Sequence, residues 1–127
     1  ELQEEGLDIT EQILTANPDV QMIWCWNQTS LLGCAAALQN AGKSDIVLMG
    51  TDMSVELAKD MQSEDITLQA ITTQMPYDMG YQAVENAVKA VKGEEVEKEV
   101  MIPTYTYTKE NMDEIQTYID EHQDLVE

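Results

Sequence analysis

Hydrophobic residues along this chain fall into short continuous runs, separated by longer stretches in which they recur every three or four positions. Three runs have the length of a β-strand, over residues 20–26, 46–49 and 66–73. A strand that is apolar without alternation is typical of a parallel sheet covered on both faces. The pattern therefore predicts three buried strands, and a shorter strand over residues 100–102.

Helices are predicted between these runs. The clearest covers residues 77–92, where apolar side chains follow helical spacing from Pro76 to Gly93. Proline suits the first turn of a helix, and glycine suits the position just after the last turn. The other predicted helices are an opening helix that stops before Pro18, then residues 29–41, residues 54–61 and a final helix carrying Met112, Ile115 and Ile119.

This order of elements predicts the fold class. Strands that alternate with helices form βαβ units, in which the strands run parallel and the crossovers are right-handed. The sequence therefore predicts an α/β fold: a three-layer, mostly parallel sheet flanked by helices. The length of 127 residues lies within the size of one domain.

The charge of the chain excludes one class of partner. Twenty-five acidic residues stand against six lysines, for a formal charge of −19 at pH 7. Such a surface repels the phosphates of nucleic acids and anionic lipids, so no nucleic acid is expected as a partner. The simplest interpretation of the acidic surface is solubility.

The sequence gives no indication of a metal, cofactor or membrane span. Cys25 lies in an apolar run and Cys34 in an alanine-rich helix, so both are interpreted as small buried hydrophobic residues rather than a disulfide or a redox pair. Two cysteines and the single histidine, His122, do not have the spacing of a metal site. No run of about 18 apolar residues is present, so no transmembrane helix is predicted.

Polar residues follow each of the three strong strands. Asn27 comes after the first, Asp52 after the second and Gln74 after the third. In an open α/β sheet, ligands bind beyond the carboxyl ends of the strands. Two amides and a carboxylate at that edge suit a polyhydroxylated ligand, because a carboxylate accepts from two hydroxyls and an amide both donates and accepts. Trp26 is a further candidate, since its ring could cover an apolar face of such a ligand.

Each candidate also has a purely structural interpretation. Asn27 and Asp52 are both suited to capping the helices that follow them. Gln74 could be an ordinary residue at the end of a strand. For Trp24 and Trp26, a place in the core is the commoner role of tryptophan. The joint placement at three successive strand ends favours the ligand site over these alternatives.

An enzymatic function is not predicted. The sequence holds no G-x-S-x-G elbow, no P-loop and no G-x-G-x-x-G motif, and no histidine accompanies a candidate nucleophile. Asp52 has no partner in the sequence that would make it a general base, and catalysis needs several groups together.

The residues as a series resemble the ribose-binding type of periplasmic binding protein, which serves ABC transporters. The resemblance covers nearly the whole chain and rests on residues 16–23, Asn27, residues 32–33 and 36–42, residues 47–50 with Asp52, residues 74–77 with 79–80, residues 84–94 and residues 108–111. It implies that Asn27, Asp52 and Gln74 contact a sugar, and that the protein is extracytoplasmic, either periplasmic or a lipoprotein tethered outside the membrane. An ABC permease is the implied partner.

The resemblance also implies a division between two lobes. Residues 1–74 would form part of the C-terminal lobe, residues 75–102 would belong to the N-terminal lobe, and residues 103–127 would return across the hinge to a terminal helix. Closure of the two lobes would enclose the ligand. Because the family's chains are at least twice as long, the sequence is expected to be a fragment that associates, for example as a swapped homodimer.

Departures from the family's pattern put the identity of the sugar in doubt. Gln28 stands where an aspartate is usual, Thr51 and Met53 flank Asp52 in place of the usual Phe-Asp-Gly, and Trp26 stands where a small or polar residue is common. The alternative function is the effector domain of a LacI-type regulator, which shares the fold and also binds sugars. The acidic surface favours the transport protein.

Overall fold

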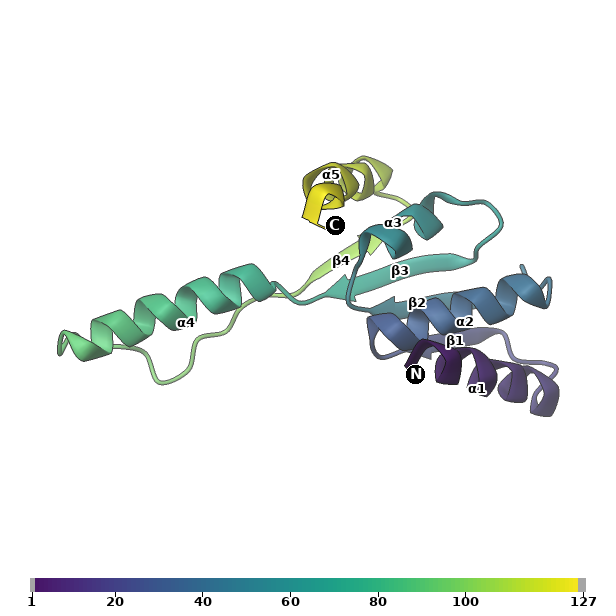
Figure 1. Ribbon diagram of the computed structural model, residues 1–127, viewed down its shortest axis with the longest axis horizontal. Coiled ribbons are helices and arrows are strands. Elements are labelled where there is room, and N and C mark those ends of the chain that lie inside the picture. The colour runs from purple at the N-terminus through teal and green to yellow at the C-terminus, as the bar shows by residue number, and fades with distance from the viewer. Residues whose placement is uncertain (1, 126–127) are drawn as a thin grey trace. The chain divides into compact units, whose positions relative to one another are not determined.

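A computed structural model of the chain describes residues 2–125, whose helices and strands alternate along the sequence (Figure 1). The strands are β1 (Met22–Cys25), β2 (Val47–Thr51), β3 (Leu68–Thr73) and β4 (Tyr105–Thr108). The helices are α1 (Leu2–Ala16), α2 (Gln28–Asn40), α3 (Val55–Gln62), α4 (Pro76–Val91) and α5 (Met112–His122), followed by a 3-10 helix, Gln123–Leu125.

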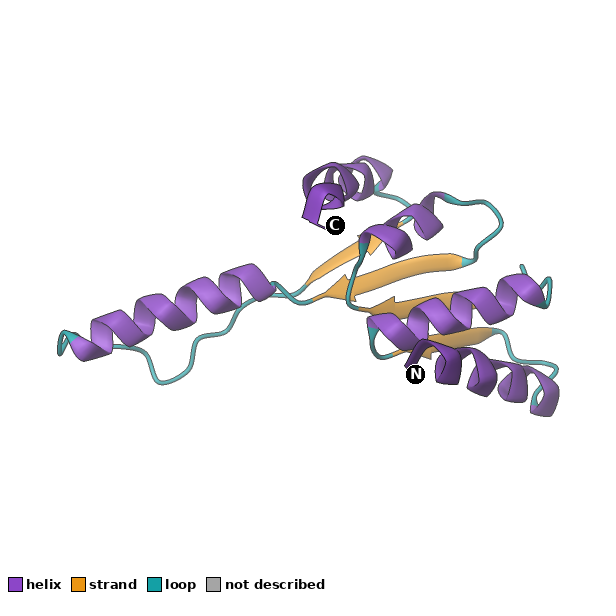
Figure 2. Ribbon diagram, in the orientation of Figure 1, coloured by secondary structure: helices purple, strands orange, loops and turns teal. Residues whose placement is uncertain are grey.

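The four strands form one sheet in the order β1-β2-β3-β4 (Figure 2). The first three are parallel neighbours, with Cys25 opposite Gly50 and Gly50 opposite Ile71. β4 runs antiparallel to β3, because Thr106 hydrogen-bonds Thr72 at the end of β3 while the later Lys109 N–H donates to the earlier Gln69 carbonyl. The predicted fold class, an α/β fold with a mostly parallel sheet flanked by helices, is confirmed, and residues 2–125 supply the helical layer on one face of that sheet.

The last strand is not where the hydrophobic pattern placed it. Residues 100–102 are irregular, and the strand is Tyr105–Thr108. Alternating threonine and tyrosine side chains suit a strand, and this segment has β3 beside it to receive its backbone hydrogen bonds. An apolar run of three residues without such a neighbour does not form a strand.

The chain divides into two compact units. The first comprises residues 1–73 and 106–127, and the second comprises residues 74–105. These boundaries fall close to the predicted crossings after Gln74 and at Ile102. That the second unit belongs to the other lobe of a two-lobed protein stays a prediction.

The core of the first unit is a single cluster between the sheet and its helices. Leu48 on β2 and Ile71 on β3 are fully buried, and so are Leu31, Leu57 and Ile115 on the three helices that pack against the strands. These side chains come from consecutive βα units. Burying them in one cluster places consecutive strands next to each other in the sheet.

Helices α1 and α2 approach each other closely. A Cβ at Gly33 would stand 2.7 Å from the Leu7 nitrogen and would also collide with the Gln3 carbonyl oxygen. Only glycine fits at this contact, since a side chain there would meet backbone that cannot rotate away. The opening helix therefore belongs to the same layer as α2.

The opposite face of the sheet is uncovered in the residues that the structure describes. On β1, Met22 and Trp24 are 56% and 59% exposed, and their partners on β2 are Val47 and Met49. The prediction that these strands are buried on both faces is therefore wrong for β1. The cause is that α2, α3 and α5 pack into one cluster on the other side, so no second helical layer covers this face within residues 2–125.

Candidate ligand-binding edge of the sheet

The register of the parallel strands aligns two of the predicted site residues. Cys25 is paired with Gly50 on β2, and Thr51 is paired with Thr72 on β3. Counting two positions on from the first pair places Asn27 beside Asp52, just beyond the carboxyl ends of β1 and β2. The structure therefore brings Asn27 and Asp52 to one edge of the sheet.

Asn27 is the N-cap of α2. Its Oδ1 accepts hydrogen bonds from the Ser30 backbone nitrogen at 2.9 Å and from the Thr29 hydroxyl at 3.1 Å. Its extended backbone, with φ −150° and ψ 165°, is the usual conformation of a cap. The structural interpretation of Asn27 is thus correct. Because the cap uses only the carbonyl oxygen of the side chain, the Nδ2 group remains for a second role.

Asp52 is not a helix cap. The side chain of Ser54 caps α3 by accepting from the Leu57 nitrogen at 3.2 Å. Asp52 instead has a φ of +67°, and it is the only non-glycine residue with positive φ among those that the structure describes. This left-handed conformation costs a residue with a Cβ about 1 kcal/mol, and aspartate tolerates it better than most.

The backbone around Asp52 is held by the neighbouring strands. Its own N–H donates to the Thr72 carbonyl at 3.0 Å, and the hydroxyl of Thr51 donates to the Trp26 carbonyl. These bonds connect the carboxyl ends of β1, β2 and β3. Strained backbone that is held by its surroundings is typical of functional positions, so Asp52 is the strongest candidate at this edge.

Trp26 lies at the same edge and is exposed. Its side chain is 73% exposed, and that of Trp24 is 59% exposed. The expectation that the tryptophans belong to the core is therefore wrong, because β1 is covered on one face only. An exposed ring beside Asn27 is available to a ligand, although exposure by itself assigns Trp26 no role.

Gln74 follows β3 directly and is exposed. It is the first residue of the second unit, so the structure does not place it beside Asn27 and Asp52. The residue before it, Thr73, ends β3 within the first unit. The inclusion of Gln74 in the site therefore rests on sequence.

Two threonines at this edge were not predicted. The hydroxyls of Thr72 and Thr106 are 3.0 Å apart, and they join the end of β3 to the start of β4. The sequence signal was the alternating threonine and tyrosine of residues 104–108. That alternation shows which residues share a face, but it does not show which strand they pair with.

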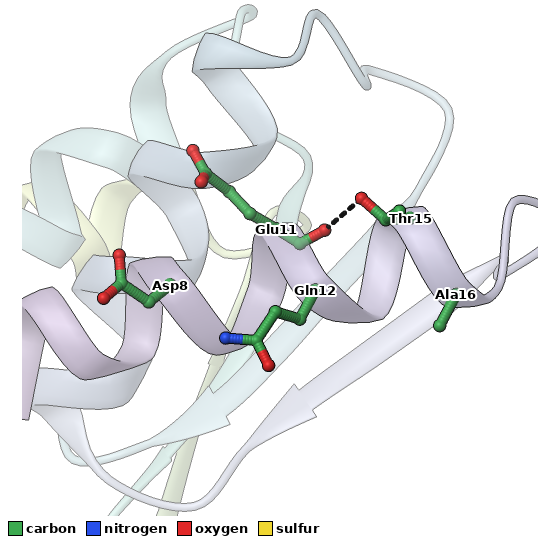
Figure 3. Close-up of a pocket in the computed structure, with 5 residues that line it drawn as sticks. All are labelled: Asp8, Glu11, Gln12, Thr15 and Ala16. Atoms are coloured by element: carbon green, nitrogen blue, oxygen red, sulfur yellow. Dashed lines mark hydrogen bonds between the residues drawn. The ribbon is translucent and has the colours of Figure 1, made fainter.

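A separate hollow on the surface does not coincide with this edge. It is lined by Asp8, Glu11, Gln12, Thr15 and Ala16, all from α1 (Figure 3). The Thr15 hydroxyl donates to the Glu11 carbonyl of its own helix at 2.9 Å. One exposed helix face lined by its own acidic side chains does not enclose a ligand, so we assign this hollow no function.

The described residues offer neither a metal site nor a membrane span. Across residues 2–125, no group of three or more histidine, cysteine, aspartate or glutamate side chains is arranged to hold a metal ion. In the same part of the chain, no helix combines the length and the apolar character needed to cross a bilayer.

Comparison with protein families gives one match over most of the chain. The family model described as periplasmic binding protein domain matches residues 1–95. This range contains both aligned site residues, Asn27 and Asp52, as well as Gln74.

Two curated proteins of Escherichia coli (strain K12) illustrate the sequence similarity. The chain is 40% identical over 93 residues to the ribose import binding protein RbsB, covering 73% of this chain and 31% of that protein. It is 36% identical over 93 residues to the D-allose-binding periplasmic protein, covering 72% of this chain and 29% of that protein. The chain thus spans about three tenths of the length of the curated relatives it matches.

Solved structures extend the similarity to the fold. An ABC sugar transporter subunit from Rhodobacter sphaeroides 2.4.1 superimposes with a TM-score of 0.77 at 32% identity, covering 86% of this chain and 40% of that one. An ABC transporter solute binding protein from Agrobacterium vitis with bound D-fucose gives a TM-score of 0.81 at 30% identity, covering 92% and 40%.

Proposed function

This chain belongs to the periplasmic binding protein family, and on that premise we propose that it is part of an extracytoplasmic solute-binding protein. The intact protein would capture a sugar or sugar-like ligand between two lobes and deliver it to an ABC permease. The curated relatives are named for ribose and D-allose, and one structural neighbour holds D-fucose. These names support the ligand class and leave the particular sugar open.

The observation that supports the proposal is the pairing of Cys25 with Gly50, because Asn27 and Asp52 each follow this pair by two positions at the carboxyl ends of β1 and β2. In the proposed site, the Asp52 carboxylate accepts hydrogen bonds from two adjacent hydroxyls of the ligand. The Nδ2 group of Asn27 donates to a neighbouring oxygen while Oδ1 keeps its cap. Hydrogen bonds to a charged group contribute about 1.5–3 kcal/mol each, so Asp52 would dominate the affinity.

Gln74 and Trp26 complete the proposed site with different roles. Gln74 would donate and accept through its amide, from the point where the chain leaves β3. Trp26 would lay its exposed ring against an apolar face of the sugar, which aromatic side chains do through their large polarisable surface.

We propose no catalytic role, because the two curated relatives are named as sugar-binding proteins and one structural neighbour is named as a subunit of an ABC sugar transporter. The same relatives favour transport over a LacI-type regulator. Delivery to an ABC permease and an extracytoplasmic location, periplasmic or as a tethered lipoprotein, follow from this proposal.

The test is a thermal-shift screen of the intact protein against pentoses, hexoses and cyclitols. A ligand at 100 times its dissociation constant adds about 2.7 kcal/mol to the free energy of unfolding, so one compound should raise the melting temperature clearly. The Asp52→Asn variant should lose this shift, since asparagine accepts the left-handed backbone but carries no charge. Isothermal titration with the best compound then gives the loss in affinity, expected to be at least about tenfold.

Asp45→Asn is the matched control. Asp45 is exposed and lies just before β2, at the opposite end of the strand from Asp52. The Asp45→Asn change removes the same charge as Asp52→Asn and should leave the thermal shift caused by the ligand unchanged. If no compound shifts the melting temperature, or if Asp52→Asn binds as well as the unchanged protein, the proposed site is wrong.

We further propose that the 127-residue chain by itself forms a homodimer through the uncovered sheet face, around Trp24 and Met49. Burial of exposed apolar area stabilises association by about 25 cal/mol per Å². Light scattering should show a dimer that Trp24→Lys dissociates. The same change at Val84, an exposed position of α4, is the control. A monomer at all concentrations, or a dimer broken only by Val84→Lys, would exclude this interface.

A further inference from the structure

The last α-helix of the chain reaches the candidate ligand-binding edge through one side chain. Helix α5 packs against α3, and its buried Ile115 and Ile119 belong to the core cluster of the first unit (Figure 1). From the same helix, the Tyr118 hydroxyl donates a hydrogen bond to the Met53 carbonyl at 3.2 Å. Because Met53 directly follows Asp52, this bond connects α5 to the backbone beside the strongest candidate of the site.

The Met53 carbonyl lies outside the hydrogen bonds of α3. Ser54 is the N-cap of that helix, and its carbonyl accepts an intrahelical bond from the Ala58 nitrogen at 2.8 Å. The Met53 carbonyl comes one residue earlier and therefore precedes the helix. Tyr118 supplies this carbonyl with a hydrogen bond that does not depend on α3.

Two hydrogen bonds enclose the left-handed conformation of Asp52. Before it, the Asp52 N–H donates to the Thr72 carbonyl at 3.0 Å, which restrains the peptide plane between residues 51 and 52. After it, Tyr118 restrains the plane between residues 53 and 54. Because each peptide unit is rigid, only the dihedral angles of Asp52 and Met53 lie between these planes. The φ of +67° at Asp52 is thus held from both sides.

The Tyr118 ring is itself held in place. It meets the Tyr107 ring of β4 edge to face, with centroids 5.5 Å apart, and it stacks on the His122 ring with centroids 4.1 Å apart. Aromatic pairs favour specific geometries, so these two contacts orient the ring. Burial, with a smaller contribution from Tyr107, raises the pKa of Tyr118 above its ordinary value of 10.0. The hydroxyl therefore keeps the proton that it donates.

We propose that Tyr118 is a positioning residue of the ligand-binding edge. Its hydroxyl restrains the peptide after Met53 and thereby keeps the Asp52 carboxylate where the hydroxyls of a ligand meet it. The inference rests on the proposed function, because Asp52 is the residue through which Tyr118 acts on a ligand. It also gives α5 a role in binding, although no residue of that helix is proposed to touch the ligand.

A purely structural role for Tyr118 is the alternative that the experiment must separate. If the hydrogen bond served only to hold α5 on α3, its loss would resemble the loss of any core contact made by α5. Tyr118→Phe removes the hydroxyl and keeps the ring. Ile119→Val is the matched control, because it trims a buried side chain one residue further along the same helix and keeps the Tyr118 hydroxyl.

The first measurement is amide hydrogen exchange of the 127-residue chain without ligand, followed by nuclear magnetic resonance. In Tyr118→Phe, the protection of the Asp52 amide should fall about fivefold, as expected for one neutral hydrogen bond. In Ile119→Val it should fall by less than about twofold, because the end of a strand exchanges through local opening rather than global unfolding. Unchanged protection of Asp52 in Tyr118→Phe, or equal losses in both variants, overturns the inference.

The second measurement is isothermal titration of the intact protein with ribose and D-allose, the sugars for which the two curated relatives are named. Tyr118→Phe should weaken the affinity about fivefold, and Ile119→Val should leave it unchanged. In the Asp52→Asn background, Tyr118→Phe should weaken it by less than about twofold, because effects that pass through one residue are not additive.

The outcomes separate this inference from the proposed function. Equal losses of affinity with and without Asp52→Asn would mean that Tyr118 does not act through Asp52, and the inference would be wrong while the ligand site stands. If neither sugar binds the unchanged protein, the proposed function fails for these two ligands. Hydrogen exchange needs no ligand, so it still decides whether Tyr118 holds Asp52 in position.

Discussion

The two units of this protein use their hydrophobic residues differently. In the first unit, side chains from α2, α3, α5 and the strands close into one buried cluster. In the second, α4 has the clearest helical pattern of the sequence but no buried residue, and Val84 and Val91 are 66% and 90% exposed. A helix can thus be fully specified by its sequence while its apolar stripe has no partner within its own unit.

The largest effect should come from truncating the core of the first unit. Leu48→Ala removes a fully buried side chain from the middle of the sheet, and we expect a loss of about 2–5 kcal/mol in the free energy of unfolding. Val84→Ala on α4 should change it by less than about 0.5 kcal/mol. Urea titration followed by tryptophan fluorescence measures the first unit, because Trp24 and Trp26 both lie in it.

The Leu48→Ala and Val84→Ala variants together test the comparison between the two units directly. If Val84→Ala destabilises the chain as much as Leu48→Ala does, the stripe on α4 is buried in solution. Because the tryptophans report on the first unit, such a result would mean that α4 stabilises that unit.

Glycines in the two units should respond with opposite signs. Gly33→Ala places a methyl group against the α1 backbone, and we expect a cost of about 1–3 kcal/mol. Gly80→Ala in α4 meets nothing within 4 Å and should stabilise the helix by about 0.5–1 kcal/mol. Circular dichroism melting of both variants measures the difference, and a stabilised Gly33→Ala chain would mean that α1 does not pack on α2.

The start of α2 provides a smaller contrast. Its cap is the Asn27 side chain, whereas α4 begins with Pro76 and has no side-chain cap. Asn27→Ala should cost about 1 kcal/mol, and Asn27→Ser should keep most of the stability because a hydroxyl also caps. Both variants lack Nδ2, so both should weaken sugar binding in the intact protein. If Asn27→Ser restores binding as well as stability, Asn27 acts only as a cap.

The smallest effect concerns Asp60 on α3. Burial raises the pKa of Asp60 above its ordinary value of 3.8, and the nearby Glu56 raises it further. The folded chain thus holds this proton more tightly than the unfolded chain, so ionising Asp60 costs stability. The free energy of unfolding should rise as the pH falls from above the folded pKa to below 3.8.

Asp60→Asn should therefore slightly increase the free energy of unfolding at pH 7. It should also remove the part of the increase at low pH that protonation of Asp60 causes. Asp78→Asn, on the exposed α4, removes the same formal charge and controls for the high negative charge of the chain. Urea titrations between pH 3 and 7 give the comparison. Equal pH dependence in both variants would mean that Asp60 is not buried.

Much of the first unit was predictable from local pattern. The runs that became β1, β2 and β3 are apolar over several positions, and the helices predicted over residues 29–41 and 54–61 lie within one residue of the ends of α2 and α3. The segment before β4 was not predictable in this way. Residues 100–102 are apolar enough for a strand, but a strand also needs a neighbour, and only Tyr105–Thr108 lies beside β3.

The candidate site was predictable in part for the same reason. That Asn27 and Asp52 lie at one edge follows from parallel strands of similar length, because both residues come two positions after the paired Cys25 and Gly50. That Ser54 rather than Asp52 caps α3, and that Asp52 takes a positive φ, depends on the hydrogen bonds at the ends of three strands. The sequence does not contain those distances.

The sequence by itself determined the order and type of most elements, the acidic surface and the positions of polar residues after each strand. These depend on residues that are near one another in the chain. The tertiary structure alone decided that one sheet face stays uncovered and that Trp24 and Trp26 are exposed. Such features depend on which helices pack on which side of the sheet. That packing brings together residues that lie far apart in the sequence, so no local sequence pattern predicts it.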